Sequence, residues 1–455
     1  MKRYLLLILA IAQMHHSFGQ EIKYQKTFAQ ALNLAGKENK PIFIYFTAKN
    51  VHLPDSLHIK PDGFTSPKVA SLYNKNFINF TIDISDSTGV KTKNMFYPDA
   101  FPAYIFLDSK GQLVYKASGV TNPVDKYIEF AETALQRIKS GNTIAQFELL
   151  DKEGKLTTSA QLKKIMDLRR ELNMPDDQSL LDRYVATLNI KDLDNYGTVL
   201  YILKAGPLAN SKTYTLIYSN RKLIDSIFKK EALTTRIAIN TRIISNSRNL
   251  AIKNKDAALA QSSANIARYT WGKDYQKANK TYTAEMLMYY KGVKDTLNYF
   301  NTADYYYDSY YLNISADSAR RSSVYAPEAI NLSPKSVFTP NSSGVILTTH
   351  VIKTSPYSSV AATLNNVAWD FYTMGTHNRL HLLKALMWSK RATELDAQYS
   401  YYDTMAHIMY QLNFIDEALM NQQKAINIAL ATPAVSQTEM QYLKGELKKM
   451  QDLLL

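Results

Sequence analysis

Four side chains that could bind a metal ion or transfer a proton lie close together early in the chain. They are His52, Asp55, His58 and Asp62. An imidazole titrates near neutral pH and is a common metal ligand, so His52 has the most potential for chemistry. A metal site also needs several ligands that converge in space, and this spacing does not supply them by itself. We therefore interpret the group as part of a surface turn, and predict no metal site and no cofactor.

The chain contains no cysteine among its 455 residues. Thiol–disulfide exchange needs a thiolate as nucleophile, so this activity is excluded. The sequence also has no glycine-rich phosphate loop, nucleophile elbow or paired-carboxylate signature. Asp403 and Thr404 look like catalytic residues, but we expect them to cap the start of a helix. The remaining candidate histidines show no ligand spacing: His350, His377, His381 and His407.

The elements that must position these residues alternate between helices and strands over residues 21–142. Dense apolar runs predict buried strands, and apolar residues three or four apart predict helices. Ser66 and Pro67 form a helix start, with Ser66 as the N-cap and Pro67 in the first turn. The predicted strands are 42–46, 77–82, 104–107 and 113–115, and the predicted helices include 28–35, one that begins after Ser66, and 124–138.

Three motifs, in this order, resemble the thioredoxin fold of exported thioredoxin-like proteins. Residues 40–48 (KPIFIYFTA) resemble the strand that enters the redox turn, and residues 65–70 (TSPKVA) resemble the helix that follows it. Residues 101–103 (FPA) resemble the cis-proline loop. The resemblance implies a thioredoxin-like α/β domain over residues 20–142.

The chain departs from that family at the redox turn itself. The turn reads Val51-His52-Leu53-Pro54, with Val51 and Pro54 where the family has its two cysteines. Tyr45 also replaces the buried acid that many members keep in the preceding strand. The resemblance therefore implies a degenerate redox turn on a retained scaffold.

A second feature of the family needs no thiol. The resemblance implies that Phe101, Pro102 and Ala103 form a peptide-binding loop, because a cis-proline leaves the preceding backbone able to pair with an extended peptide. The alternative is that the loop only preserves the fold and neighbouring side chains fill the groove.

The first residues have the pattern of a signal peptide. Lys2 and Arg3 precede a short apolar core at 4–12, and Ser17 and Gly19 suit a cleavage before Gln20. We predict a signal peptide over residues 1–19 and an exported protein, either periplasmic or secreted. No later stretch is long and apolar enough to cross a bilayer, so we predict no membrane insertion.

Strand signals fade from residue 143 onward. Helical spacing of apolar residues predicts an α-helical region over 143–330. Its densest tyrosine cluster, at 304–311, is interpreted as helix packing, with a carbohydrate- or peptide-stacking surface as the alternative. Prolines and small polar residues predict a linker over 331–360, or a long excursion with a short strand at 345–347.

The C-terminal residues contain a repeat. Ala418 and Ala425 follow Ala385 and Ala392 at an interval of 33 residues. Tyr402, Ala406, Ala418 and Ala425 form a pattern of one large side chain followed by three small ones. This pattern resembles the tetratricopeptide repeat, in which small side chains lie where two helices cross. The resemblance implies tetratricopeptide-like repeats over 361–455, with a longer turn near residues 375–378 in the first of them. Residues 143–330 would then contain degenerate helical repeats.

The formal net charge is +14, but Lys and Arg are mixed with Asp and Glu along the chain. This pattern favours a solvated mixed-charge surface, so we predict no nucleic-acid partner. The leading functional hypothesis is a non-catalytic protein that binds a protein or peptide through its thioredoxin-like groove and its helical-repeat surface. The alternatives are a structural protein in which the first domain caps the helical array, and an enzyme with non-cysteine chemistry. The oligomeric state stays open.

Overall fold

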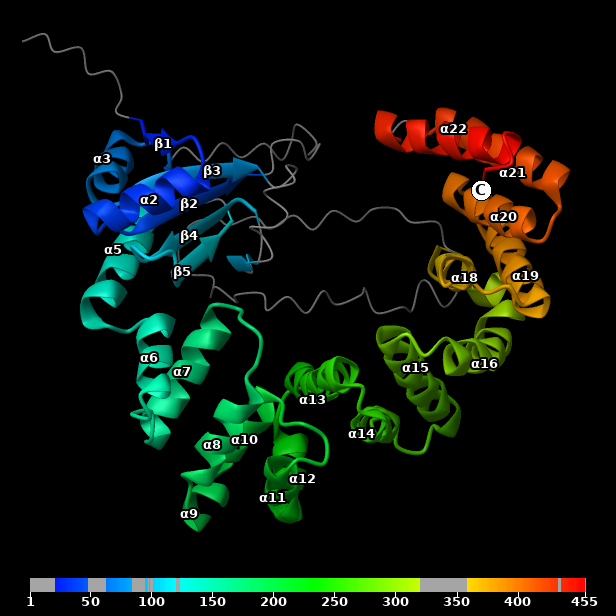
Figure 1. Cartoon of the computed structure of the whole chain (residues 1–455). Helices are drawn as coiled ribbons and strands as arrows, with labels where there is room; N and C mark the ends of the chain where they lie inside the picture. Colours follow the sequence, from blue (N-terminus) through cyan, green and yellow to red (C-terminus); the bar gives the residue numbers. More distant parts are fainter. Residues whose placement is uncertain are drawn as a thin grey trace, which may run out of the picture. The chain divides into compact units, whose positions relative to one another are not determined.

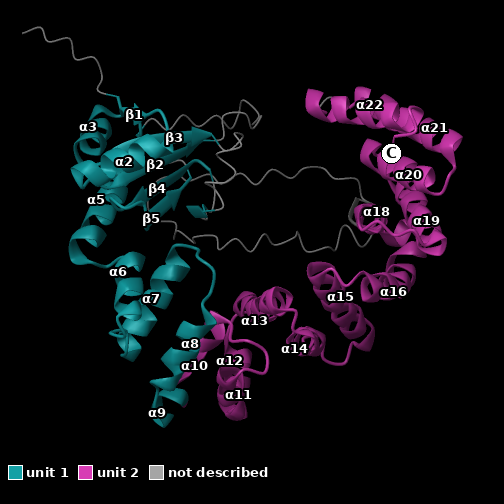
Figure 2. Ribbon diagram, in the orientation of Figure 1, with its two compact units in different colours: residues 1–193, 335–347 teal, residues 194–334, 348–455 magenta. Residues whose placement is uncertain are grey.

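The structure is a computed structural model that describes residues 21–47, 63–83, 95–96, 98, 101–119, 123–319, 358–432 and 435–454. The predicted signal peptide, the turn at 51–54, the group between His52 and Asp62 and nearly all of the predicted linker lie outside the described residues. An N-terminal sheet flanked by helices precedes a mainly helical region (Figure 1). Two compact units divide the chain, with a boundary between Leu193 and Asp194 (Figure 2).

Unit 1 contains a mixed sheet of five strands in the order β1-β3-β2-β4-β5. β1, β3 and β2 are mutually parallel, whereas β4 is antiparallel to both β2 and β5. The central strands β2 and β4 are almost entirely buried, which explains their unbroken apolar runs. The strands are β1 (Tyr24–Gln25), β2 (Ile42–Thr47), β3 (Ile78–Asp83), β4 (Ala103–Leu107) and β5 (Leu113–Ser118).

Helices cover both faces of this sheet. On one face, the Phe43 ring of β2 lies 4.6 Å from that of Tyr73, and the Tyr104 ring of β4 lies 5.3 Å from that of Tyr127. These two partners belong to α3 (Pro67–Asn76) and α5 (Val124–Ser140). On the other face, Phe28 of α2 (Phe28–Glu38) packs on Phe80 of β3 at 5.9 Å. As predicted, α3 begins at the Ser66 cap, whose hydroxyl oxygen accepts from the Lys68 N–H.

Further helices follow in both units, and most begin at an Asp, Asn, Ser or Thr cap that accepts from a first-turn N–H. In unit 1 they are α6 (Ile144–Lys152), α7 (Ser159–Glu171), α8 (Gln178–Ala186) and α9 (Ile190–Leu193). Unit 2 contains α10 (Tyr196–Ala205), α11 (Lys212–Ser219), α12 (Arg221–Lys230), α13 (Leu233–Asn254), α14 (Ala257–Tyr269), α15 (Tyr275–Val293), α16 (Thr296–Tyr307), the π-helical turn η2 (Asp308–Leu312), α18 (Ser358–Thr373), α19 (Arg379–Leu395), α20 (Tyr399–Gln411), α21 (Ile415–Leu430) and α22 (Gln437–Gln451). Among the described helices, none combines the length and the apolar character needed to cross a bilayer.

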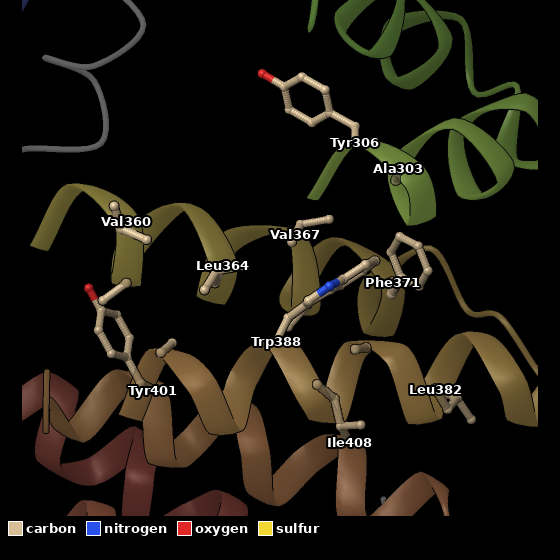
Figure 3. Packing of buried hydrophobic residues seen from close by; sticks show 14 of the residues in the cluster. Ala303, Tyr306, Val360, Leu364, Val367, Phe371, Leu382, Trp388, Tyr401 and Ile408 are labelled. Atoms are coloured by element: carbon tan, nitrogen blue, oxygen red, sulfur yellow. The ribbon is translucent and has the colours of Figure 1, made fainter. Parts of the chain in front are cut away.

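A hydrophobic core of unit 2 joins α16 to the helices that follow residue 358. Trp388 of α19 is fully buried, and its ring lies 5.0 Å from that of Phe371 in α18 (Figure 3). Its indole N–H donates to the Asp308 carboxylate of η2 at 2.8 Å. Lys384 of α19 pairs with the same carboxylate. A partly buried polar contact at the side of the apolar core therefore joins η2 to α19.

The predicted repeat positions are buried between the last helices. Ala385, Ala392, Ala406, Ala418 and Ala425 are all fully buried, because a small side chain lets two helices approach closely. The turn from α18 to α19 is also longer than the turn from α20 to α21, as predicted.

Two features of the fold differ from the sequence analysis. Asp403 and Thr404 do not cap a helix, because they lie inside α20, whose N-cap is Gln398. The sequence analysis also missed β1, which has only two residues and exists through its pairing with β3.

Candidate functional site

The predicted peptide-binding loop lies at the start of β4. The Phe101–Pro102 peptide bond is cis. Ala103 is fully buried, and it pairs with Phe46 of β2 and Ser118 of β5. The Pro102 carbonyl accepts from the Gly119 N–H at 2.9 Å. An added strand thus cannot pair with Ala103, which is inside the sheet.

The predicted peptide pairing concerns the backbone of Phe101, before Pro102, and stays a prediction; the loop also presents two side chains. Phe101 and Pro102 are half-buried, and the Phe101 ring lies 6.4 Å from that of Phe46. The degenerate turn at Val51, His52, Leu53 and Pro54 lies outside the described residues, so the structure does not place it relative to this loop.

A second candidate surface is formed by α18, α20 and α22, which run parallel to one another. Near the start of α20, the Tyr399 hydroxyl lies 3.1 Å from Glu439 of α22, and farther along His407 lies 3.2 Å from Glu446. Residue numbers rise in both helices from one contact to the next, so the two helices are parallel. On α18, the Tyr372 ring contacts His407 at 5.1 Å, and Val360 lies toward the end of α20 that carries Tyr401 (Figure 3).

A cluster of buried polar side chains holds this layer together. The His407 imidazole is 1% exposed, with Nδ1 2.8 Å from the Asp403 carbonyl oxygen and Nε2 3.2 Å from a Glu446 carboxylate oxygen. The fully buried Gln422 of α21 donates to the Asp403 carboxylate at 2.8 Å and to the Leu443 carbonyl at 3.2 Å. Lys449 donates to the second Glu446 oxygen at 2.6 Å. We call Asp403, His407, Gln422 and Glu446 the polar cluster.

The proton positions in the polar cluster follow from hydrogen-bond chemistry. A carbonyl oxygen only accepts, so His407 Nδ1 carries a proton. The contact between Nε2 and Glu446 then needs one more proton, supplied by an imidazolium or by a carboxylic acid.

The two carboxyl groups are perturbed in opposite directions. Burial raises the pKa of Asp403, against the opposing effects of His407 and Gln422. Burial also acts to raise the pKa of Glu446, but hydrogen bonds from Lys449 and His407 outweigh it and leave that pKa lowered. The two acids therefore differ in their preference for the charged state.

Aromatic side chains border the polar cluster. Trp369 stacks on Tyr372 at 5.0 Å, and both rings contact His407 edge to face. Tyr442 of α22 is about half exposed. Burial raises the pKa of Tyr372 and of Tyr442, with further contributions from the carboxylates of Asp403 and Glu446. Both phenols are therefore neutral at physiological pH, and they suit contact with a ligand through ring faces and hydroxyl groups.

The hydrogen bonds of the polar cluster position side chains of α20, α21 and α22 relative to one another. No cysteine, serine or threonine nucleophile is hydrogen-bonded to His407 among the described contacts. Across the described part of the chain, no three His, Asp or Glu residues are placed to hold a metal ion.

The sequence analysis did not find the polar cluster. The one local signal was the spacing of Asp403 and His407, which are four residues apart on one helical face. Gln422 and Glu446 come from other helices, and only the packing of α20 against α21 and α22 brings them to His407.

The chain matches no protein-family model and no curated protein sequence.

Proposed function

We propose that the chain is an exported, non-redox thioredoxin-like protein that binds a protein or peptide, with the layer α18, α20 and α22 as its main contact surface. The sheet order β1-β3-β2-β4-β5, with helices on both faces, supports the thioredoxin-like assignment of the first domain. The buried alanines at the 33-residue interval support the tetratricopeptide-like assignment of the last helices. Export is supported by the residue pattern of 1–19.

The observation that carries the proposal is the parallel arrangement of the three helices. α18 contacts α20 through aromatic rings, and α20 contacts α22 through hydrogen bonds. Because residues 401–408 of α20 are buried between its neighbours, a ligand lying across the layer would meet mainly the accessible side chains of α18 and α22. Trp369 and Tyr372 of α18 are half-buried and Tyr442 of α22 is exposed, so all three are aromatic side chains that a ligand on this layer can reach. Such side chains dominate the binding energy of many protein interfaces, because they bury a large area at a small entropic cost.

Unit 1 has a smaller part in this proposal. Without a thiol it cannot form a mixed disulfide with its ligand, so any contact there is non-covalent. Phe101 and Pro102 would supply a second, apolar contact through their side chains.

A site-specific photo-crosslinker tests the proposal. With the crosslinker in place of Tyr442, we expect one recurring protein adduct from the cells that produce the full chain. The matched control replaces Leu380, which is well exposed on α19 and outside the α18–α20–α22 layer. The same adduct from both positions, or no adduct from position 442, would contradict the proposal. The substitutions Phe101→Ala and Pro102→Ala then ask whether the first domain contributes, since they should weaken capture without abolishing it.

A further inference from the structure

Several large apolar and aromatic side chains are exposed on one part of unit 2. They lie at the start of α13 and around the turn between α14 and α15. Leu233 and Ile237 are four residues apart on α13 and are 61% and 40% exposed. Tyr269, Trp271 and Tyr275 are 75%, 42% and 72% exposed. Five such side chains at the start of α13 and around the α14–α15 turn leave more apolar area exposed to water than a single scattered residue would.

These side chains share one end of the helices because α13 and α14 are antiparallel. The Ser263 hydroxyl of α14 donates to the Ile244 carbonyl of α13 at 2.9 Å. Tyr269 lies six residues after Ser263. In an antiparallel pair it is therefore level with the residue six positions before Ile244, which directly follows Ile237 in the sequence. Trp271 follows in the turn between α14 and α15, and Tyr275 is the first residue of α15. Figure 1 shows this turn between the two helices.

The same segment is strongly basic. Residues 221–280 contain 13 Lys and Arg but four Asp and Glu, which accounts for nine of the chain's net 14 positive charges. Lys229, Lys230 and Lys273 are exposed at this end, and within the described residues none of them pairs with a carboxylate.

Two of the acids at this end, Glu231 and Asp274, are already engaged, and a third, Asp225, lies one turn before Lys229 on α12. Glu231 accepts from the Tyr196 hydroxyl at 2.8 Å, and Asp274 caps α15 and pairs with Lys277 at 3.0 Å. The Lys277 ammonium lies 5.4 Å from the centre of the Trp271 ring. This end therefore presents uncompensated positive charge beside exposed apolar groups.

We propose that this cationic aromatic edge, formed by Leu233, Ile237, Tyr269, Trp271 and Tyr275 with Lys229, Lys230 and Lys273, binds peripherally to a bilayer surface rich in anionic lipid headgroups. Tyr and Trp favour the boundary between membrane and water, where the ring is in an apolar layer and the polar group stays hydrated. Leu233 and Ile237 gain by entering the acyl boundary, and each lysine near the surface gains from the negative surface potential.

The aliphatic side chains of Leu233 and Ile237 favour a bilayer over a single-stranded nucleic acid as the ligand. Exposed aromatic rings beside lysines can also stack on bases. Leu233 and Ile237, however, find no partner on a phosphate backbone, whereas a bilayer receives all five apolar side chains along one surface.

Flotation of the full mature chain with lipid vesicles tests this inference. We expect binding to phosphatidylcholine vesicles that contain phosphatidylglycerol, weak binding to pure phosphatidylcholine, and loss of binding at high salt, because salt screens the surface potential. The Trp271 emission should shift to the blue on binding, since this indole is partly exposed while that of Trp388 is already buried.

Matched charge reversals locate the contact. Lys229→Glu with Lys230→Glu should weaken vesicle binding by about tenfold or more. Lys253→Glu with Lys255→Glu changes the net charge equally at the opposite end of α13, and should have little effect. Leu233→Ser with Ile237→Ser should also weaken binding without changing net charge.

Several outcomes would overturn the inference. These are no vesicle binding, equal binding with and without phosphatidylglycerol, equal effects of the two charge reversals, or binding to single-stranded DNA in preference to vesicles.

Discussion

His407 shows how a single buried residue can connect two helices. Its Nδ1–H bonds to the Asp403 carbonyl one turn earlier in α20, which fixes the ring orientation. With the ring so fixed, Nε2 points to Glu446 of α22. The aromatic contacts of Trp369 and Tyr372 cover the ring from α18. We infer that the imidazole sets the relative positions of the three parallel helices.

The first prediction concerns Glu446→Gln. The lowered pKa of Glu446 means that its carboxylate stabilises the fold above the unfolded-state pKa of about 4.3, and that this contribution is lost as pH falls through the lower, folded-state value. The variant should therefore be less stable than the wild type near neutral pH, and the difference should shrink in acid. Urea unfolding measured by tryptophan fluorescence over a pH series checks this.

Asp403→Asn is the matched counterpart and should behave in the opposite way. Burial raises the Asp403 pKa, so the wild type loses stability as pH rises above about 3.9 toward the raised folded-state value. An asparagine keeps the oxygen that accepts from Gln422 but never ionises. Its stability relative to the wild type should therefore increase as pH rises above about 3.9, whereas the relative stability of Glu446→Gln should decrease as pH rises toward about 4.3. Parallel pH trends in the two variants would be inconsistent with the opposite pKa shifts.

At the scale of elements, α13 stabilises the end of α10. Arg242 of α13 donates to the Lys204 carbonyl at 3.2 Å, and Asn246 donates to the Gly206 carbonyl at 2.8 Å. Ser247 of α13 accepts from the Ala209 N–H at 2.8 Å. The carbonyls that a helix leaves unpaired at its C-terminus are thus bonded by side chains of another helix.

Gly206→Ala tests this contact. Gly206 has φ +71°, and a Cβ there would overlap Arg242 Cγ and lie 2.8 Å from Asn246 Nδ2. Gly375 has φ +69° with no atom within 4 Å of a Cβ, so Gly375→Ala carries the same backbone cost without the clash. Each variant should lose about 1–2 kcal/mol from its left-handed backbone, and Gly206→Ala should lose about 2 kcal/mol more from overpacking. Thermal unfolding followed by tryptophan fluorescence measures the difference; equal losses would mean that α13 yields to the added methyl group.

Elements with strong local signals were the ones that the sequence predicted well. The apolar run at 42–46 and the Ser66 cap identify β2 and α3, because burial and capping leave a direct trace in residue type. β1 and η2 leave no such trace, since the first depends on pairing with β3 and the second on the contact of Asp308 with Trp388. Asp403 was misassigned because a carboxylate in a polar run looks like a cap until its burial is known.

At the scale of the whole molecule, the two units differ in their aromatic residues, and therefore in the spectroscopic signal that follows the unfolding of each. The chain has three tryptophans, Trp271, Trp369 and Trp388, and all three lie in unit 2. Unit 1 instead has a tyrosine- and phenylalanine-rich core, which includes Phe43, Tyr73 and Tyr104. No disulfide ties the units together, because the chain has no cysteine.

This distribution makes independent unfolding of the units measurable. Each unit has its own buried core, so we expect unit 1 and unit 2 to lose structure at different denaturant concentrations. Tryptophan emission would follow only unit 2, whereas far-ultraviolet circular dichroism would follow the helices of both. The circular dichroism curve should therefore contain a transition that the tryptophan emission curve lacks, while the transition common to both curves should respond to Gly206→Ala. Superimposable curves from the same samples would show instead that the two units unfold as one cooperative structure.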